Sequence, residues 1–194
     1  MTQTPQIPLN YGFLSEAVKF YRLHGFEYIE VPWVVPAVYT KGLARTQAVY
    51  PVGDGDTLLT NGEQAFIFLL DQGVLELGKR YQTITPCFRE KEQYSEWFLP
   101  YFMKLELIQT DLNGAEDLLS IAAQFFQSLG IPAKSVSTAI GTDLVWEGIE
   151  LGSYGTRAMK LPKKECSWSY GTGIAEPRLS NALKHAKLQA SPKQ

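Results

Sequence analysis

The sequence predicts an α+β domain in which a mainly antiparallel β-sheet is flanked by helices. Three observations favour this class. Segments of helical periodicity alternate with segments rich in β-branched and aromatic residues. Several expected strands follow one another closely, as antiparallel neighbours do. The chain has 194 residues, 45% of them hydrophobic, so it is long enough to bury a core without disulfide bridges.

The first helix and strand are marked by the residues at their ends. Ser15 is suited to cap a helix, and His24-Gly25 is suited to end it because glycine tolerates the left-handed conformation. Phe26–Val31 then has the composition of a strand, which Pro32 ends because proline cannot donate a ladder hydrogen bond. We therefore expect a helix, a glycine, a strand and a proline in this order.

A hairpin and a buried helix are expected next. The turn at 53–56 contains two Gly-Asp pairs, which favours a hairpin between Ala48–Val52 and Thr57–Thr60. From about Gly62 to Gly78, apolar residues occupy most sides of a helical pattern, so this helix is expected to be buried.

The middle of the chain predicts two paired strands and a helix. Tyr81–Phe88 and Tyr101–Thr110 have strand composition and are linked by the charged, aromatic stretch Arg89–Pro100, which favours antiparallel pairing. Ala115–Leu129 has helical periodicity, with acidic residues in its first turn where the helix dipole favours negative charge. Gly130 is suited to end that helix.

The last quarter predicts two more strands and a final helix. The strands are expected over Asp143–Gly152 and Ser153–Leu161. The small-residue turn at Gly171–Gly173 is expected to open a helix over about Ala175–Leu188. No internal repeat interrupts the order of these elements.

Charge is distributed unevenly along the chain. The net charge is −2, but residues 156–194 carry 8 Lys and Arg against 2 Asp and Glu, and residues 1–155 carry 10 against 18. The basic C-terminal fifth suits a polyanion such as a nucleotide or nucleic acid, or else it is a solvated lysine-rich tail.

The cysteines and the apolar runs bear on the compartment. Cys87 and Cys166 lie far apart with no partner at metal-ligand spacing, so we expect two thiols, no structural zinc and a reducing compartment. No apolar run reaches the roughly 18 residues of a membrane span, and the first residues lack the pattern of a signal peptide. We expect a cytoplasmic protein without a membrane partner.

Polar residues on the strand over 101–110 have the spacing of a binding site. Because successive strand residues face opposite sides, Phe102, Lys104 and Glu106 share one face, and Arg89 stands at the end of the neighbouring strand. An aromatic ring, a cation and a carboxylate on a common surface indicate a site. The alternative is a solvated edge strand, which does not require Phe102 on the polar face.

Three segments in this order are similar to motifs 1, 2 and 3 of class II aminoacyl-tRNA synthetases, most closely the seryl type. They are HGFEYIEVPWVVP, the pair TPCFR and FMKLE, and YGTGIAEPR. The resemblance covers roughly residues 14–185. It implies a class II synthetase-like fold and ATP-dependent activation of an amino acid to an aminoacyl adenylate, with transfer to tRNA or another acceptor.

The resemblance also implies roles for residues. Arg89 and Arg178 would be catalytic, with Arg89 on the α-phosphate and the attacking carboxylate, and Phe102 stacked on adenine. GIELGS resembles the strand that holds Mg²⁺, which implies Glu150 and Ser153 as metal ligands. TNGEQA resembles the loop that meets the amino acid's ammonium group. The implied ATP site comprises Arg89, Glu90, Glu92, Phe102, Glu150, Ser153, Gly171, Gly173 and Arg178; the implied amino-acid site comprises Glu63, Lys104 and Glu106.

Two departures from the family pattern leave the acceptor open. Position 91 is Lys91 where the family has glutamate, so Glu90 or Glu92 would have to take its place on the adenine. The loop between Arg89 and Phe102 is shorter than in the seryl family, where it contacts the tRNA acceptor end. We expect a stand-alone catalytic core, divided into an N-terminal extension, the synthetase-like catalytic domain and a disordered tail at 1–13, 14–188 and 189–194.

The resemblance further implies a homodimer through the motif 1 segment, residues 24–36, with Phe26 and Trp33 in the interface. Trp97, Trp146, Tyr154 and Trp168 are candidates to bound the amino-acid side chain. The main alternative function is a non-catalytic paralogue that binds an amino acid or nucleotide as a regulatory or accessory subunit. A biotin-ligase-like enzyme is a third hypothesis, but the sequence lacks the basic glycine-rich loop that we would expect of it.

Overall fold

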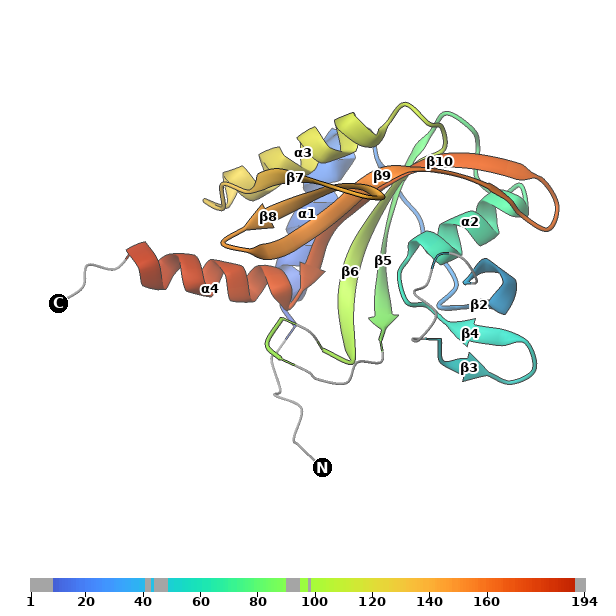
Figure 1. The fold of residues 1–194 in the computed structure, drawn as a ribbon, viewed down its shortest axis with the longest axis horizontal. Coiled ribbons are helices and arrows are strands. Elements are labelled where there is room, and N and C mark those ends of the chain that lie inside the picture. The colour runs from blue at the N-terminus through green and yellow to red at the C-terminus, as the bar shows by residue number, and fades with distance from the viewer. Residues whose placement is uncertain (1–8, 41–42, 44–48, 90–94, 98, 191–194) are drawn as a thin grey trace.

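A strongly twisted seven-stranded sheet forms the centre of the computed structural model, which describes residues 9–40, 43, 49–89, 95–97 and 99–190 (Figure 1). The order across the sheet is β1 (Glu27–Tyr28), β5 (Arg80–Phe88), β6 (Tyr101–Gln109), β10 (Glu165–Glu176), β9 (Ile149–Lys160), β8 (Gly141–Trp146) and β7 (Lys134–Thr138). Neighbouring strands in this sheet pair antiparallel, except that β1 and β5 pair parallel. The predicted α+β class with a mainly antiparallel sheet is confirmed.

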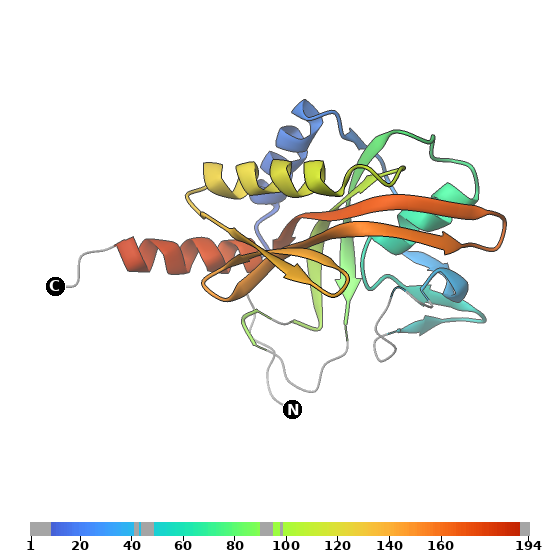
Figure 2. The same ribbon diagram turned by 45° about the horizontal axis from the view of Figure 1, so that its top comes forward.

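Helices cover both faces of this sheet (Figures 1 and 2). The helices α1 (Tyr11–Leu23) and α3 (Ala115–Ser128) pack together on one face. The other face carries α2 (Glu63–Asp71) and a small sheet in the order β2 (Val34–Pro36), β4 (Asp56–Leu58) and β3 (Pro51–Val52), with the short 3₁₀ helix η1 (Ala37–Tyr39). The last helix, α4 (Arg178–Ala190), projects from the end of β10. No helix within the described ranges is long and apolar enough to cross a membrane.

Two hydrophobic cores result from this layering. The first joins α1 and α3 to the sheet through large buried side chains such as Tyr21, Leu105, Phe126 and Tyr154. The second joins α2 and the small sheet to the opposite face through Phe66, Leu70 and Trp168, among others. The central strands are buried on both faces, which fixes the direction of their side chains.

The N-terminal helix begins earlier than the sequence predicts. Ser15 lies inside α1, and Asn10 is the cap, because its side-chain oxygen accepts hydrogen bonds from the backbone N–H groups of Gly12 and Phe13. The prediction of Ser15 as cap is therefore wrong. The strand expected over Phe26–Val31 is reduced to the two residues of β1.

Several other predicted elements match the structure. The hairpin around residues 53–56 is present as β3 and β4, and β5 pairs antiparallel with β6. The helix α3 agrees with its prediction to within a residue. The helix α2 is shorter than expected, since it ends at Asp71 and Gly73 adopts a positive φ of 76°.

The last quarter of the chain departs most from the prediction. The two strands expected over Asp143–Gly152 and Ser153–Leu161 are present as β8 and β9, but they are divided at residues 147–148 and not after Gly152, which lies inside β9. The strand β7 was not predicted. Gly171–Gly173 does not form a turn but lies within β10, and α4 begins at Arg178 rather than Ala175. A register irregularity occurs at Gly173, where the hydroxyls of Tyr21 and Tyr154 donate to the carbonyls of Gly173 and Thr172. These bonds satisfy backbone groups that an irregular ladder leaves unpaired.

Candidate active site

One face of β5 and β6 carries most of the polar residues that the sequence singled out. Phe102, Lys104 and Glu106 lie on the same face, directly opposite Cys87, Thr85 and Thr83 of β5. The intervening residues of β6, Leu105 and Leu107, are buried in the core with α1 and α3. The predicted common face of Phe102, Lys104 and Glu106 is thus confirmed, and it lies on the side of the sheet that carries α2.

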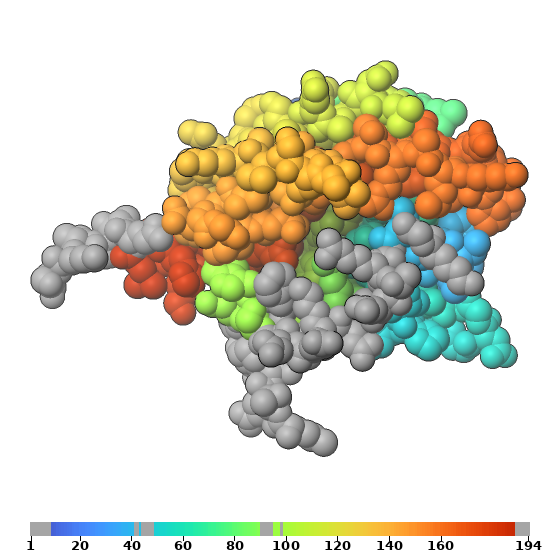
Figure 3. All heavy atoms as spheres, viewed as in Figure 1, coloured from blue at the N-terminus to red at the C-terminus, as the bar shows by residue number. Residues whose placement is uncertain are grey.

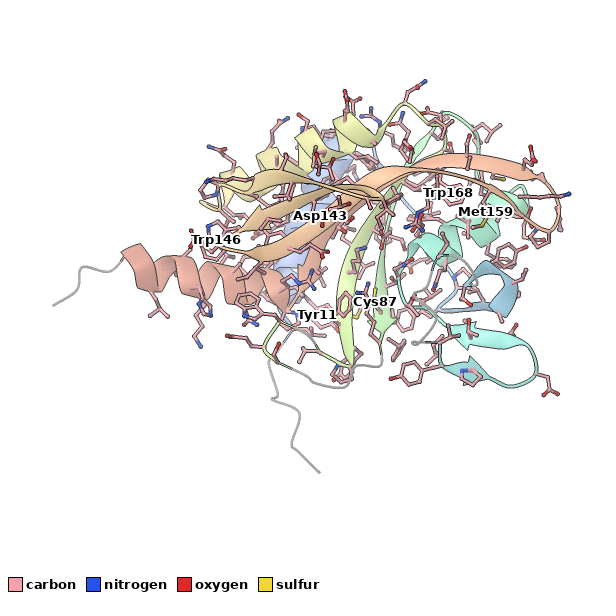
Figure 4. All side chains as sticks on the ribbon, in the orientation of Figure 1. Tyr11, Cys87, Asp143, Trp146, Met159 and Trp168 are labelled. Atoms are coloured by element: carbon pink, nitrogen blue, oxygen red, sulfur yellow. The ribbon has the colours of Figure 1, made fainter. Side chains whose placement is uncertain are left out.

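Arg89 and Phe102 stand at one end of this face. The Arg89 guanidinium carbon lies 5.1 Å from the centroid of the Phe102 ring, and its Nε donates to the backbone oxygen of Thr60 at 3.4 Å. Figure 4 shows Cys87 near this end of β5. A cavity opens here, lined by Arg89, Trp97, Leu99, Phe102, Ala175, Glu176, Pro177 and Arg178. An aromatic ring and two guanidinium groups that line one cavity suit a planar, anionic ligand such as a nucleotide.

Arg178 reaches this cavity from the first turn of α4. Its Nη1 donates to the backbone oxygen of Glu150 at 2.9 Å and lies 3.7 Å from the Glu150 carboxylate. Burial lowers the pKa of Arg178, and the Glu150 carboxylate acts in the opposite direction. These contacts fix Arg178 between β9 and the cavity.

Glu96 and Trp97 pack on α4. Asn181 donates from Nδ2 to the backbone oxygen of Glu96 at 2.7 Å, and the Trp97 ring lies 5.2 Å from the ring of His185. Trp97 thereby forms a wall of the cavity, while Glu90 and Glu92 lie outside the described residues.

Glu150 and Ser153 lie beside another residue with a carboxylate, Asp143, that the sequence did not single out. An irregularity in the pairing of β8 with β9 adds Leu151 as an extra residue, so Glu150 and Ser153 can share a face although they are three apart. Asp143 of β8, which is labelled in Figure 4, pairs across the sheet with Ser153, as the strand register gives it. Burial raises the pKa of Asp143, the Ser153 hydrogen bond lowers it, and the charge of Glu150 raises it. Only the register in which β8 pairs with β9 could have indicated that Asp143 lies beside Ser153.

Glu63 begins α2 and is buried against the opposite end of the same face. Its Oε1 accepts a hydrogen bond from Nε1 of Trp168 at 2.7 Å, and its Oε2 lies 3.2 Å from Nη1 of Arg157. Burial raises the pKa of Glu63 to about 6, against the opposing effects of Arg157 and Trp168. Both carboxylate oxygens already have partners, which the resemblance did not imply.

Glu106 lies between Glu63 and the cavity lined by Arg89 and Arg178. Lys104 Nζ lies 2.9 Å and 2.8 Å from its two carboxylate oxygens, and the Glu106 side chain is almost fully buried. The negative charge of Glu106 also contributes to raising the pKa of Glu63. The face therefore carries two carboxylates, each paired with a cation.

Gly171 and Gly173 are required by packing on the other face. A Cβ at Gly171 would lie 2.7 Å from the Tyr154 ring, and one at Gly173 would lie 2.9 Å from Leu105 and 3.0 Å from Tyr21. Their missing side chains would therefore point into the core with α1 and α3. The expectation that these glycines open a ligand-binding turn is wrong, since both lie within a strand; a backbone role toward ATP stays a prediction.

The aromatic candidates divide between the two faces. Trp168 donates a hydrogen bond to Glu63. Trp97 lines the cavity. Both residues therefore lie where the sequence predicted them, close to the site. Trp146 and Tyr154 instead belong to the core on the α1 and α3 side, so they are not on the site face. Phe26, expected in a dimer interface, is 1% exposed and buried in that same core, so that expectation is wrong.

The known proteins to which this chain is similar in sequence or structure are aminoacyl-tRNA synthetases. No protein-family model matches the chain. A serine–tRNA ligase of Cenarchaeum symbiosum (strain A) is 25% identical over 155 residues, which cover 70% of this chain and 37% of that protein. The chain thus spans well under half the length of this curated relative.

Solved structures are similar over most of the chain. A pyrrolysyl-tRNA synthetase from Desulfitobacterium hafniense superposes with a TM-score of 0.68 at 17% identity, covering 94% of this chain and 73% of that one. A seryl-tRNA synthetase from Pyrococcus horikoshii, complexed with ATP, gives 0.69 at 18% identity over 89% of this chain and 49% of that one. A cytoplasmic serine-tRNA ligase from Naegleria fowleri, in complex with AMP, superposes with a TM-score of 0.69 at 19% identity, covering 89% of this chain and 52% of that one.

The fold is that of the catalytic domain of class II aminoacyl-tRNA synthetases. Within this class, the chain is similar in sequence to a serine–tRNA ligase and in structure to seryl and pyrrolysyl enzymes. The resemblance inferred from the three motifs is confirmed at this level.

Proposed function

We propose that this chain activates an amino acid with ATP, forming an aminoacyl adenylate and releasing pyrophosphate. The observation that carries the proposal is the cavity at the end of β5 and β6, which Arg89, Phe102 and Arg178 line together. Arg89 lies against the Phe102 ring, and Arg178 contacts Glu150. The similarity to a serine–tRNA ligase supports the same chemistry.

The reaction is a displacement at the α-phosphorus. A carboxylate oxygen of the amino acid attacks that phosphorus, the bond to the bridging oxygen breaks, and pyrophosphate leaves with its electron pair. Such a reaction needs positioning and charge stabilisation rather than a protein nucleophile. Arg89 would bind the α-phosphate and the attacking carboxylate, Phe102 would stack on adenine, and Arg178 would face the nucleotide from the other side.

The oxygen donors beside Arg178 suit a magnesium ion bound with ATP. Glu150, Ser153 and Asp143 offer two carboxylates and a hydroxyl, which are ligands that Mg²⁺ accepts. Within the described residues, no cluster of three or more His, Cys, Asp or Glu offers a larger metal site. When bound, the ion would neutralise charge on the phosphate oxygens.

The amino acid would lie along the face between Arg89 and Glu63. Glu106 and Glu63 supply negative charge for its ammonium group, and Lys104 holds Glu106 in place. The acceptor of the aminoacyl group is tRNA or another molecule. We place the catalytic domain at 14–188 and infer a cytoplasmic homodimer that forms through residues 24–36.

ATP–pyrophosphate exchange against the full panel of amino acids tests the proposal. A signal with one amino acid demonstrates activation and identifies the substrate together. A flat panel at high protein concentration contradicts the proposal and favours the non-catalytic paralogue, which binds an amino acid or nucleotide without turnover.

A further inference from the structure

The cavity lined by Arg89, Phe102 and Arg178 is too small for a nucleotide in this conformation. Its volume is about 20 Å³, which is space for about one water molecule. Pockets that hold a small ligand enclose roughly 300–1,000 Å³. At least one side chain of the wall must therefore move before a nucleotide can enter.

Much of the wall belongs to the frame of the sheet. Phe102 lies in β6, and Ala175 and Glu176 lie in β10, which is the neighbour of β6 in the sheet. The pairing of these strands fixes the side to which each residue points. Arg178 is held by its contacts with the backbone oxygen and the carboxylate of Glu150. These residues form a rigid part of the wall.

Trp97 comes from the connection between β5 and β6, outside this frame. In Figures 1 and 2, the described part of this connection lies beside the start of α4. Asn181 Nδ2 donates to the backbone oxygen of Glu96 at 2.7 Å, and His185 Nε2 lies 3.5 Å from the Glu96 carboxylate. The Trp97 and His185 rings lie 5.2 Å apart. Because Asn181 and His185 are four residues apart, one face of α4 holds Trp97 in the wall.

Trp97 is the largest side chain of the wall, so its departure releases the most space. Its indole is partly buried against the core that contains α1 and α3. Arg89 also has a long side chain, but it rests on Phe102 and is needed beside the phosphates in the proposed function. Moving Trp97 exposes apolar surface, which costs free energy that the ligand must offset. The apparent affinity for ATP is then reduced by the small fraction of molecules that are open.

We propose that Trp97 closes the nucleotide site of the free protein, and that ATP binds only when residues 95–97 leave α4. Asn181 and His185 hold the closed state. This inference rests on the proposed function, because it takes the cavity as the ATP site.

Calorimetric titration of ATP and Mg²⁺, without an amino acid, tests the closed state. Trp97→Ala should bind ATP at least about tenfold more tightly than the wild type, because it removes the side chain that fills the site. His185→Ala, which removes the ring that contacts Trp97, should act in the same direction by a smaller factor. Lys184→Ala removes an exposed neighbour on α4 and should leave the affinity unchanged.

Acrylamide quenching of tryptophan fluorescence tests the movement itself. Among the four tryptophans, Trp33 is exposed, whereas Trp146 and Trp168 are buried. Saturating ATP should increase quenching in the wild type, because Trp97 moves from a partly buried position into solvent. The increase should be absent from Trp97→Phe.

The outcomes separate the inference from the proposed function. ATP binding that is equal or weaker in folded Trp97→Ala, or quenching that does not rise with ATP, overturns the inference and leaves the ATP site in place. If Trp97→Ala does not fold, His185→Ala and the quenching decide. The expected affinities without pyrophosphate exchange for any amino acid support the inference and contradict activation. Absence of ATP binding in the wild type and in every folded variant overturns both.

Discussion

The indole nitrogen of Trp168 donates a 2.7 Å hydrogen bond to the buried carboxylate of Glu63, joining residues 105 positions apart in the sequence. Trp168 comes from β10 and Glu63 from the first turn of α2, and Arg157 of β9 meets the same carboxylate. Figure 4 shows Trp168 beside α2. Three elements therefore converge on one acidic group, whose ionisation is linked to folding.

Glu63→Gln should change how stability depends on pH. Burial raises the pKa of Glu63 from 4.5 to about 6, so the folded protein binds this proton more tightly than the unfolded chain. The group therefore favours folding below about pH 4.5, and this contribution, on the order of 2 kcal/mol, is lost as the pH rises through 6.

Denaturant unfolding of wild type and Glu63→Gln between pH 4 and 8 measures this effect. The difference between their free energies of unfolding is the readout, because Asp143 and Glu176 also have raised pKa values and affect both proteins alike. We expect the wild type to lose stability relative to the variant as the pH rises. A difference that does not vary with pH would contradict the assignment.

Arg89→Ala should abolish adenylate formation and leave the fold intact. Loss of a charge-assisted contact to the reacting phosphate is expected to slow single-turnover formation by on the order of 10²- to 10³-fold, or about 3–4 kcal/mol. Arg22→Ala is the matched control, since Arg22 is exposed at the end of α1. Wild-type rates in folded Arg89→Ala would show that Arg89 is not on the reacting group.

Glu150→Gln should weaken the metal dependence of ATP binding more than the binding of the amino acid. Glu150 is exposed beside Ser153 and Asp143, where its carboxylate is placed to share an ion with ATP. Calorimetric titration of ATP with and without Mg²⁺ measures the dependence. Glu147→Gln, at the exposed turn of the same hairpin, is the control. Equal metal dependence in all three proteins would remove Glu150 from the site.

Trp33→Glu should convert a homodimer into a monomer. The proposed interface segment 24–36 contains two exposed apolar residues, Trp33 (51% exposed) and Val34 (37%). Val38, just beyond the segment, is 49% exposed. In Figure 3, light-blue atoms from this part of the chain are visible at the surface beside the cyan atoms of the hairpin of β3 and β4. A buried charge without a partner destabilises an apolar, two-fold interface. Sedimentation at micromolar concentration measures the change, with Leu77→Glu, an exposed leucine elsewhere, as the control. A monomeric wild type contradicts the prediction.

Much of the site face was predictable because its signals are local. Alternation along one strand is enough to place Phe102, Lys104 and Glu106 together, since a buried strand fixes the side to which each residue points. The helix α3 and the hairpin of β3 and β4 likewise follow from periodicity and turn residues within a few positions of one another. The three motif segments also carried the family resemblance.

Other features depend on residues that are distant in the sequence. Gly171-Thr172-Gly173 resembles a turn when considered alone, yet it lies in β10 because the Tyr21 and Tyr154 hydroxyls satisfy the carbonyls that the irregular ladder exposes. Its glycines are needed where α1 and α3 approach the sheet, which no local pattern indicates.

By itself, the sequence determined the class of fold, the order of the motifs and the residue types available for chemistry, because these follow from local periodicity and composition. Only the tertiary structure decided which charges are paired. Glu63 is held by Arg157 and Trp168 because α2 packs against strands that lie about a hundred positions further along the chain. Asp143 lies beside Ser153 because of the register in which the consecutive strands β8 and β9 pair. The physical reason is that burial and ion pairing depend on distances between side chains, which sheet register and helix packing set together.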